Sequence, residues 1–401
     1  MSTENKIAVG IDPDACIACT TCTVFCPVAA ATGEFLGPKM IGPAYERFRL
    51  SGLEEDKSLS YCSNCKNCDI SCPQGVSIAS INMVARARQN AKNHPHFLRD
   101  WIVSHSETLA SLISPVPACV KNWFLGTRLV RQALNGVGIT GDVPMPSYAP
   151  KPFRKKLREL NQAADGKTVA FFPGCYVDLY DAKAGEDLVW LLGKAGYKVE
   201  IPSDFHCCGV PMIASGFMDD ARKNAARNLE AMRACAAQGI PVITACPSCE
   251  LMFREEIPTF FPDLAKDDVP VMLDAQEFVL NELREGRLSL ALKDKEPKVL
   301  YHAPCHMRAL GIGLPGYELL RTLGANVQPA NAGCCGISGS YGFKKEKHEV
   351  SMKVGAELFR AVKESGAGIV ATECGTCRLQ ITGATGVQSL HPFSIVRALA
   401  E

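Results

Sequence analysis

The stretch Cys334-Cys335-Gly336, together with its second copy Cys207-Cys208-Gly209, organises the whole 401-residue sequence. One cysteine precedes each adjacent pair and a C-x-x-C follows it, so that each copy comprises five cysteines. Equivalent cysteines of the two copies lie 130, 127 and 128 residues apart (175 to 305, 207 to 334 and 246 to 374). A nearly constant offset of this kind indicates an internal duplication.

The segments around these cysteines predict an α/β fold. Patterns of helical periodicity alternate with short apolar runs, which is typical of helices packed on a buried parallel sheet. The cysteines then fall just beyond the carboxyl ends of strands, where open α/β sheets place their ligands. Each of the runs leads into a cysteine, and they are found at residues 168–172, 241–244, 299–302 and 368–371.

Five thiols per copy predict an iron–sulfur site. A [4Fe–4S] cubane takes four thiolates, and an adjacent pair points its side chains apart, which suits bridging between irons or a cluster of unusual connectivity. Two copies with matching flanks disfavour the alternative of unconnected core thiols. His206, His302 and His306 stand beside these cysteines and are expected to act as hydrogen-bond donors more than as ligands. The candidate ligands are Cys175, Cys207, Cys208, Cys246 and Cys249 in the first copy, and Cys305, Cys334, Cys335, Cys374 and Cys377 in the second.

Two further cysteine motifs lie near the N-terminus, and each reads C-x2-C-x2-C-x3-C-P. This spacing gives three thiolates to one [4Fe–4S] cubane and sends the fourth cysteine to the other cubane. A pair of zinc knuckles is the less favoured alternative, because four cysteines and a proline recur together. The predicted ligand sets are Cys16, Cys19, Cys22 and Cys72 for one cluster, and Cys62, Cys65, Cys68 and Cys26 for the other.

These observations divide the chain into several domains of mixed α+β and α/β class. A two-cluster ferredoxin-like helical domain is expected at residues 1–94 and a helical amphipathic segment with a linker at residues 95–160. Two tandem cysteine-rich α/β modules are expected at residues 161–289 and 290–401. The middle segment has two interpretations: a helical linker docked on its neighbours, or an interfacial segment that meets a membrane or a membrane partner. Cys119 and Cys235 are both expected to be packed thiols.

Composition limits the function. A net charge of +1 argues against a general nucleic-acid partner. Met1–Lys6 lacks the apolar region of a signal peptide, and no run of about 18 apolar residues predicts a membrane-spanning helix. Twenty cysteines in a chain kept in a reducing compartment favour metal ligation over disulfides.

The cysteine patterns C-x31-CCG-x36-C-x2-C and C-x28-CCG-x37-C-x2-C resemble the CCG domain of heterodisulfide reductase catalytic subunits. With the ferredoxin motifs, the chain is similar to the D subunit of heterodisulfide reductase and to the glycolate oxidase iron–sulfur subunit. It most resembles the C subunits of anaerobic glycerol-3-phosphate dehydrogenases. That resemblance rests on stretches such as residues 61–66, 103–105, 301–307 and 334–346.

The resemblance implies an iron–sulfur subunit of a quinone-linked oxidoreductase complex in anaerobic respiration. Its partners would be a flavin-containing (FAD or FMN) A subunit and a B subunit, its acceptor menaquinone, and its place the cytoplasmic face of the inner membrane, as a peripheral protein. The five-cysteine sites would hold two further [4Fe–4S] clusters, cubane or noncubane. Some relatives lack part of the first five-cysteine set, which is complete here, so a glycolate- or lactate-oxidising dehydrogenase and a heterodisulfide-reductase-like catalytic subunit stay open as alternatives.

The chain itself is not expected to oxidise the organic substrate, because no G-x-G-x-x-G opens a helix after a strand. The neighbouring His302 and His306 make the second module the preferred electron exit, and these two histidines are the candidate residues there.

Overall fold

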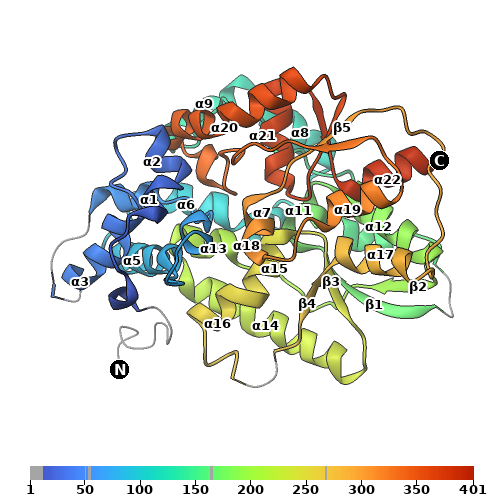
Figure 1. The fold of residues 1–401 in the computed structure, drawn as a ribbon, viewed down its shortest axis with the longest axis horizontal. Coiled ribbons are helices and arrows are strands. Elements are labelled where there is room, and N and C mark those ends of the chain that lie inside the picture. The colour runs from blue at the N-terminus through green and yellow to red at the C-terminus, as the bar shows by residue number, and fades with distance from the viewer. Residues whose placement is uncertain (1–11, 50, 53–55, 163–165, 267–268) are drawn as a thin grey trace.

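The computed structural model describes residues 12–49, 51–52, 56–162, 166–266 and 269–401 (Figure 1). Met1–Lys6, on which the expectation about a signal peptide rests, lies outside these described residues. The N-terminal third is helical, and it lies across the same side of two α/β units that follow in the chain (Figure 1).

Two parallel sheets form the C-terminal part, and their topologies are copies of each other. The first has the strand order β2-β1-β3-β4 and the second has the order β6-β5-β7-β8, with every neighbouring pair parallel. The duplication in the sequence is therefore a duplication of topology. The strands are β1 (Lys167–Phe172), β2 (Tyr197–Glu200), β3 (Val242–Thr244), β4 (Met272–Asp274), β5 (Val299–Tyr301), β6 (Val327–Pro329), β7 (Ile369–Ala371) and β8 (Gln388–Leu390).

The four predicted apolar runs are β1, β3, β5 and β7, the two central strands of each sheet. Their side chains are nearly all buried, as a strand covered on both faces requires. The four outer strands are short and carry polar residues, so the apolar pattern does not reveal them.

Helices cover both faces of the sheets. In the first module they are α11 (Gly174–Leu179), α12 (Ala182–Lys194), α13 (Val210–Ser215), α14 (Met218–Ala237), α15 (Pro247–Leu251), η5 (Met252–Glu256), α16 (Ile257–Phe260) and α17 (Ala275–Arg284). In the second they are α18 (Cys305–Leu310), α19 (Pro315–Thr322), η6 (Tyr341–Phe343), α20 (Lys345–Ser365), α21 (Gly375–Thr385) and α22 (Pro392–Ala400).

One apolar cluster joins the two modules. It contains Phe171 and Leu188 of the first module and Tyr301 and Phe393 of the second, all fully buried. Because α22 packs on α12 and α19 packs on α17, the two sheets share a core and stabilise each other.

The ferredoxin-like part is made of short helices around one longer helix. Helix α5 begins after the second cysteine motif, and Ile78, Ala79 and Ile81 pack it against Cys22 and Cys68. The elements are η2 (Pro13–Ala15), α1 (Thr21–Val24), α2 (Pro27–Ala31), η3 (Met40–Ala44), α3 (Tyr45–Arg49), η4 (Lys57–Tyr61), α4 (Asn67–Ile70) and α5 (Ile78–Lys92).

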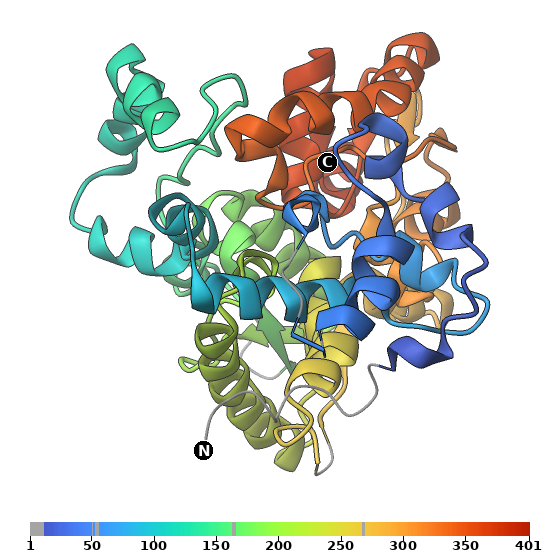
Figure 2. The ribbon, with the colours of Figure 1, turned by 90° about the vertical axis from the view of Figure 1, so that its left-hand side faces the viewer.

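The middle segment splits into two parts that behave differently. Helices α6 and α7 meet at the buried His105 and dock on the first module, where α6 contacts α13 and α7 contacts α11. Helices α8 and α9 stand away from the body of the molecule (Figure 2). The elements are α6 (Phe97–Ser104), α7 (Ser106–Leu112), α8 (Ala118–Gly126), α9 (Arg128–Gly136) and α10 (Phe153–Leu157).

Two predictions about single thiols have opposite outcomes. Cys235 is buried on the inner face of α14, as expected. The prediction for Cys119 is wrong, because this thiol is exposed on α8, a helix that buries none of its own residues. No described helix has both the length and the apolar character needed to cross a bilayer.

Candidate metal centres

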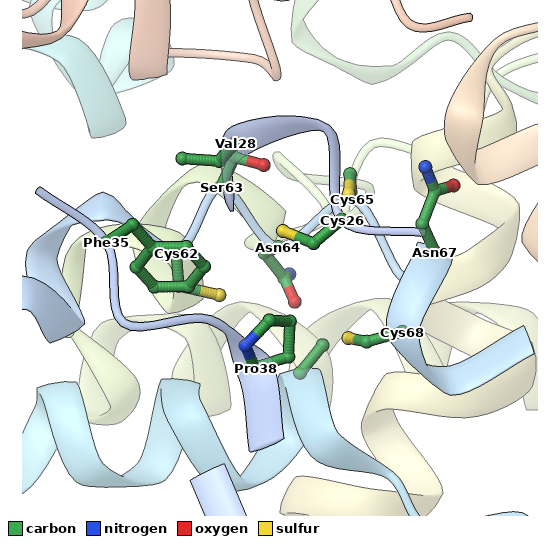
Figure 3. A pocket seen from close by; sticks show the side chains of 11 residues that line it. Cys26, Val28, Phe35, Pro38, Cys62, Ser63, Asn64, Cys65, Asn67 and Cys68 are labelled. Atoms are coloured by element: carbon green, nitrogen blue, oxygen red, sulfur yellow. The ribbon is translucent and has the colours of Figure 1, made fainter. Parts of the chain in front are cut away.

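The eight ferredoxin-type cysteines form two groups in space. One cavity is lined by Cys26, Cys62, Cys65 and Cys68, and Figure 3 shows these four thiols around the same space. A second cavity is lined by Cys16, Cys19, Cys22 and Cys72. In each group the fourth cysteine comes from the other motif, which is the exchange that the spacing predicts; the assignment of iron to these thiols remains a prediction.

Matching backbone conformations shape the two cysteine loops. Ala18 and Thr20 in the first motif have positive φ, and so do Asn64 and Lys66 at the same positions of the second. Such conformations cost a residue with a side chain about 1 kcal/mol or more, and they persist where the surrounding structure fixes them. Each loop therefore curls around its cavity in the same way, which directs its three cysteines to one centre.

Backbone and amide N–H groups point at several sulfurs. The amide of Ala29 donates to Cys26 Sγ at 3.5 Å, and that of Val76 donates to Cys72 Sγ at 3.4 Å. The side-chain amide of Asn82 donates to Cys62 Sγ at 3.4 Å. Hydrogen bonds of this kind stabilise thiolates and set the potential of an iron–sulfur cluster.

Burial makes these thiols costly to ionise without a metal. It raises the pKa of Cys26 to about 11 and, with the neighbouring Cys334 and Cys26 adding to the effect, that of Cys65 to about 12. Clustered thiols that include such buried members and stay free of disulfides suit a metal, whose charge deprotonates coordinating sulfur. The donor set and its N–H neighbours therefore fit [4Fe–4S] clusters.

The five cysteines of the second module gather beyond the carboxyl ends of the two central strands. Cys305 begins α18 after β5, and Cys374 caps α21 after β7. The sulfurs of Cys335 and Cys377 lie 3.1 Å apart, and the amide of Gly336 donates to Cys334 Sγ at 3.3 Å. The loop that carries Cys334 and Cys335 completes the group of five cysteines.

Gly336 is required for the conformation of that loop. Its φ is +87°, and a Cβ there would lie 1.9 Å from the carbonyl oxygen of Ser351 in α20. The glycine lets the loop pass close to a helix, and that contact aims Cys334 and Cys335.

The first module repeats this arrangement with its own cysteines. Cys175 follows β1 in α11, and Cys246 caps α15 after β3. Close contact with Cys207 raises the pKa of Cys175, and contacts with Cys208 and Cys246 raise that of Cys249. The structure thus brings together each of the two five-cysteine sets.

Helix α7 contributes two residues to the first module's site that the sequence did not single out. The Glu107 carboxylate accepts a hydrogen bond from the Cys207 amide at 2.5 Å and lies 3.4 Å from His206 Nδ1. Contact with Cys207 and burial raise the pKa of Cys175, and a contact with Ser106 opposes this rise. These residues are about a hundred positions from the CCG pair, so no local pattern marks them.

The histidines beside the cysteines differ in their surroundings. A ring nitrogen of His302 lies within 4.8 Å of the sulfurs of Cys335 and Cys377, and its Nε2 has no hydrogen-bond partner in the described structure. Burial lowers its pKa to about 4, so the ring is neutral at pH 7. The corresponding residue of the first module is Phe172, so the two sites differ by one polar group.

His306 has both ring nitrogens engaged and stands where three cysteine loops meet. Its Nδ1 lies 2.8 Å from Ser248 Oγ, between Cys246 and Cys249 of the first module. Its Nε2 lies 3.0 Å from the carbonyl oxygen of Asn64, in the second ferredoxin motif. The neighbouring Cys305 belongs to the second module, so this ring ties three sites together.

Three buried carboxyl groups lie behind the cysteine sites, at the junction of the modules. Burial raises the pKa of Glu250 and of Glu373 to about 7, and it raises that of Asp274 well above its usual range, with Glu250 adding repulsion. Tyr301 donates to Glu373 Oε1 at 2.8 Å. The group keeps polar side chains inside an otherwise apolar junction.

Comparison with protein families agrees with this division. Residues 12–76 match the family described as a 4Fe-4S dicluster domain. Residues 169–254 and 299–382 each match the family described as a cysteine-rich domain, the CCG family. The chain is therefore an iron–sulfur protein with a ferredoxin-type domain followed by two CCG domains.

Two of three similar proteins align with nearly the whole chain, and the third aligns with about half of it. The C subunit of the anaerobic glycerol-3-phosphate dehydrogenase of Escherichia coli K12 is 39% identical over 396 residues, which span 96% of this chain and 98% of that protein. The B subunit of the fumarate reductase (CoM/CoB) of Methanothermobacter marburgensis is 24% identical over 96% of this chain and 70% of its own length. Lactate utilization protein A of Bacillus subtilis is 29% identical over 54% of this chain and 92% of its own length. On the identity and coverage of the first of these, this chain belongs to the family of anaerobic glycerol-3-phosphate dehydrogenase C subunits.

Proposed function

We propose that this chain is the electron-transfer subunit of a membrane-associated anaerobic glycerol-3-phosphate dehydrogenase. A flavin-containing A subunit oxidises glycerol 3-phosphate, a B subunit completes the complex, and this chain carries electrons to menaquinone at the cytoplasmic face of the membrane. The 39% identity to the C subunit of the E. coli enzyme supports the choice of complex. The chain contributes iron–sulfur centres and does not oxidise the substrate itself.

The ligands are the eighteen cysteines in four groups. Two cubane [4Fe–4S] clusters occupy the ferredoxin cavities, one held by Cys16, Cys19, Cys22 and Cys72 and the other by Cys26, Cys62, Cys65 and Cys68. Two further [4Fe–4S] clusters occupy the modules, each with five thiols as a noncubane site would use. The grouping of the thiols and the N–H donors on their sulfurs support these assignments.

One observation supports the electron path: a cysteine of the ferredoxin cavity lies near cysteines of the second module. Burial raises the pKa of Cys65 most, and Cys334 lies close enough for its charge to raise that pKa further. The pKa of Cys305 is raised mainly by its contact with Cys334 and by burial, and the charge of Cys65 raises it further. Electrons therefore pass from the ferredoxin cavity that contains Cys65 to the second module.

Tyr176 connects the second module to the first. It follows Cys175, and its ring lies so close to Gly375, beside Cys374, that a Cβ there would be 2.1 Å away. On this path the first module is the exit, and the second-module exit favoured by His302 and His306 stays the alternative.

Iron counting and substrate reduction test the proposal together. The chain is loaded anaerobically, and about sixteen irons are expected, four per cluster, against about eight if only the ferredoxin clusters form. Glycerol 3-phosphate is then added with the A and B subunits, and cluster reduction is followed by electron paramagnetic resonance. Clusters that stay oxidised with active A subunit present would exclude this function.

Other substrates separate the alternatives. Glycolate and lactate, each with its own flavin partner, serve as comparison donors, because lactate utilization protein A is also similar to this chain. A heterodisulfide added to the reduced chain alone tests for catalysis at a CCG site. Oxidation of the clusters by the heterodisulfide without a quinone would favour the catalytic alternative.

A further inference from the structure

Helices α8 and α9, called here the apolar hairpin (residues 118–136), expose large apolar side chains to an unusual degree. Trp123 is 70% exposed and Leu129 is 79% exposed, and Phe124, Val120 and the preceding Leu112 are similarly uncovered. No residue from 111 to 138 is buried, although the stretch is helical for most of its length. Large exposed apolar side chains that gather in one segment are typical of an interaction site.

The hairpin is attached to the rest of the chain by specific contacts, so its exposure is not that of a loose end. The side chain of Asn122 exchanges two hydrogen bonds with the backbone of Tyr148, at 2.9 and 2.8 Å. Beyond α9, Ile139 is buried in the second module and pairs with Lys344. Figure 2 shows the two helices projecting from the molecule on the side that carries α6 and α7.

The charge of the segment is one-sided. Between Glu107 and Asp142 there is no acidic residue, whereas Lys121, Arg128 and Arg131 are all basic. None of the three pairs with a carboxylate among the described residues: Lys121 lies over the Tyr148 ring and Arg131 donates to a carbonyl. An apolar surface edged by positive charge complements the anionic face of a bilayer.

We propose that the apolar hairpin inserts its exposed side chains into the headgroup region of an anionic lipid bilayer. Trp123 and Leu129 enter the interface, and Arg128 and Arg131 contact lipid phosphates. The inference rests on the proposed membrane-associated function and adds the surface that makes the contact. Because α7 leads from the first module's site into this hairpin, docking brings that site toward the bilayer, where menaquinone resides.

Co-sedimentation with vesicles tests this docking without substrate or partner subunits. The cluster-loaded chain is mixed with vesicles of phosphatidylcholine alone or with one-third phosphatidylglycerol. Binding to the anionic vesicles is expected to exceed binding to the neutral ones and to weaken with salt. Replacing Arg128 and Arg131 with Gln should weaken it roughly fivefold per charge, and Trp123→Ser with Leu129→Ser about tenfold or more.

Matched controls use exposed residues elsewhere. Arg284→Gln with Arg321→Gln removes the same charge, and Phe48→Ser with Val271→Ser removes comparable exposed apolar surface. These variants should bind as the unmodified chain does. Vesicle binding by the hairpin variants equal to that of the unmodified chain would overturn the proposal. If these variants instead fail to bind the A or B subunit, the hairpin is a subunit interface, which would overturn it as well. Reduction by glycerol 3-phosphate in solution is read separately, so failure of docking is not mistaken for failure of the proposed function.

Discussion

Replacing His302 with Phe should lower the reduction potential of the second module's cluster. The substitution copies the first module, where Phe172 occupies the corresponding position. His302 is buried, neutral at pH 7 because burial lowers its pKa to about 4, and places a ring nitrogen within 4.8 Å of two cysteine sulfurs. A donor to sulfur stabilises the more negative, reduced cluster, so its loss favours the oxidised form.

The size of the shift is taken from the energy of the one hydrogen bond that this ring, unpartnered at Nε2 in the described structure, would donate to a ligand sulfur. A net contribution of about 1 kcal/mol corresponds to about 40 mV for a one-electron couple, since about 59 mV equals a tenfold change. Redox titration followed by electron paramagnetic resonance measures it, with the other clusters as internal references. His302→Gln keeps an N–H donor and should shift less. An unchanged potential in His302→Phe, with full iron content, would refute the role of this ring.

Three further predictions concern folding and stability. Gly336→Ala should abolish the second module's site, because φ is +87° and the Ser351 carbonyl would be 1.9 Å away; iron analysis should show about four irons fewer. Gly375→Ala should destabilise the chain by about 1–3 kcal/mol through overpacking against the Tyr176 ring, whereas Gly193→Ala, helical and uncrowded, should stabilise it by up to about 1 kcal/mol; thermal melts of the two variants compare them. The native chain holds protons on the buried carboxyls around Asp274 that the unfolded chain has lost, so stability should fall from pH 4.5 toward pH 7, and melts of Asp274→Asn should depend less on pH.

The sequence was sufficient to predict the features that depend on spacing. Central strands such as Lys167–Phe172 are continuous apolar runs, and the repeated offsets between cysteines predict two modules of one topology. Edge strands such as Val327–Pro329 carry polar and exposed residues and form no continuous apolar run, so the pattern does not reveal them. The exposed Cys119 was missed for a different reason: its apolar neighbours indicate burial, but α8 buries none of its residues.

Contacts between distant segments were beyond prediction. Glu107 reaches the Cys207 amide across 100 residues, and His306 reaches Asn64 across 242. Neither contact leaves a local signal, because the residues that meet have no common period or motif. The relative order of the sites, and with it the choice of exit, depends on such contacts alone.

Two sites with the same five thiols need not have the same role, and their surroundings separate them. The second module places His302 beside its sulfurs and packs against the loop that carries Cys65. The first module has Phe172 instead, and its neighbours are Glu107 and the helix that leads to the exposed hairpin. A donor-rich site between two others suits an internal relay, and a site beside a surface segment suits an exit. On the proposed path, the two modules thus share one framework, and the helices that precede them in the chain distinguish the surroundings of the two sites.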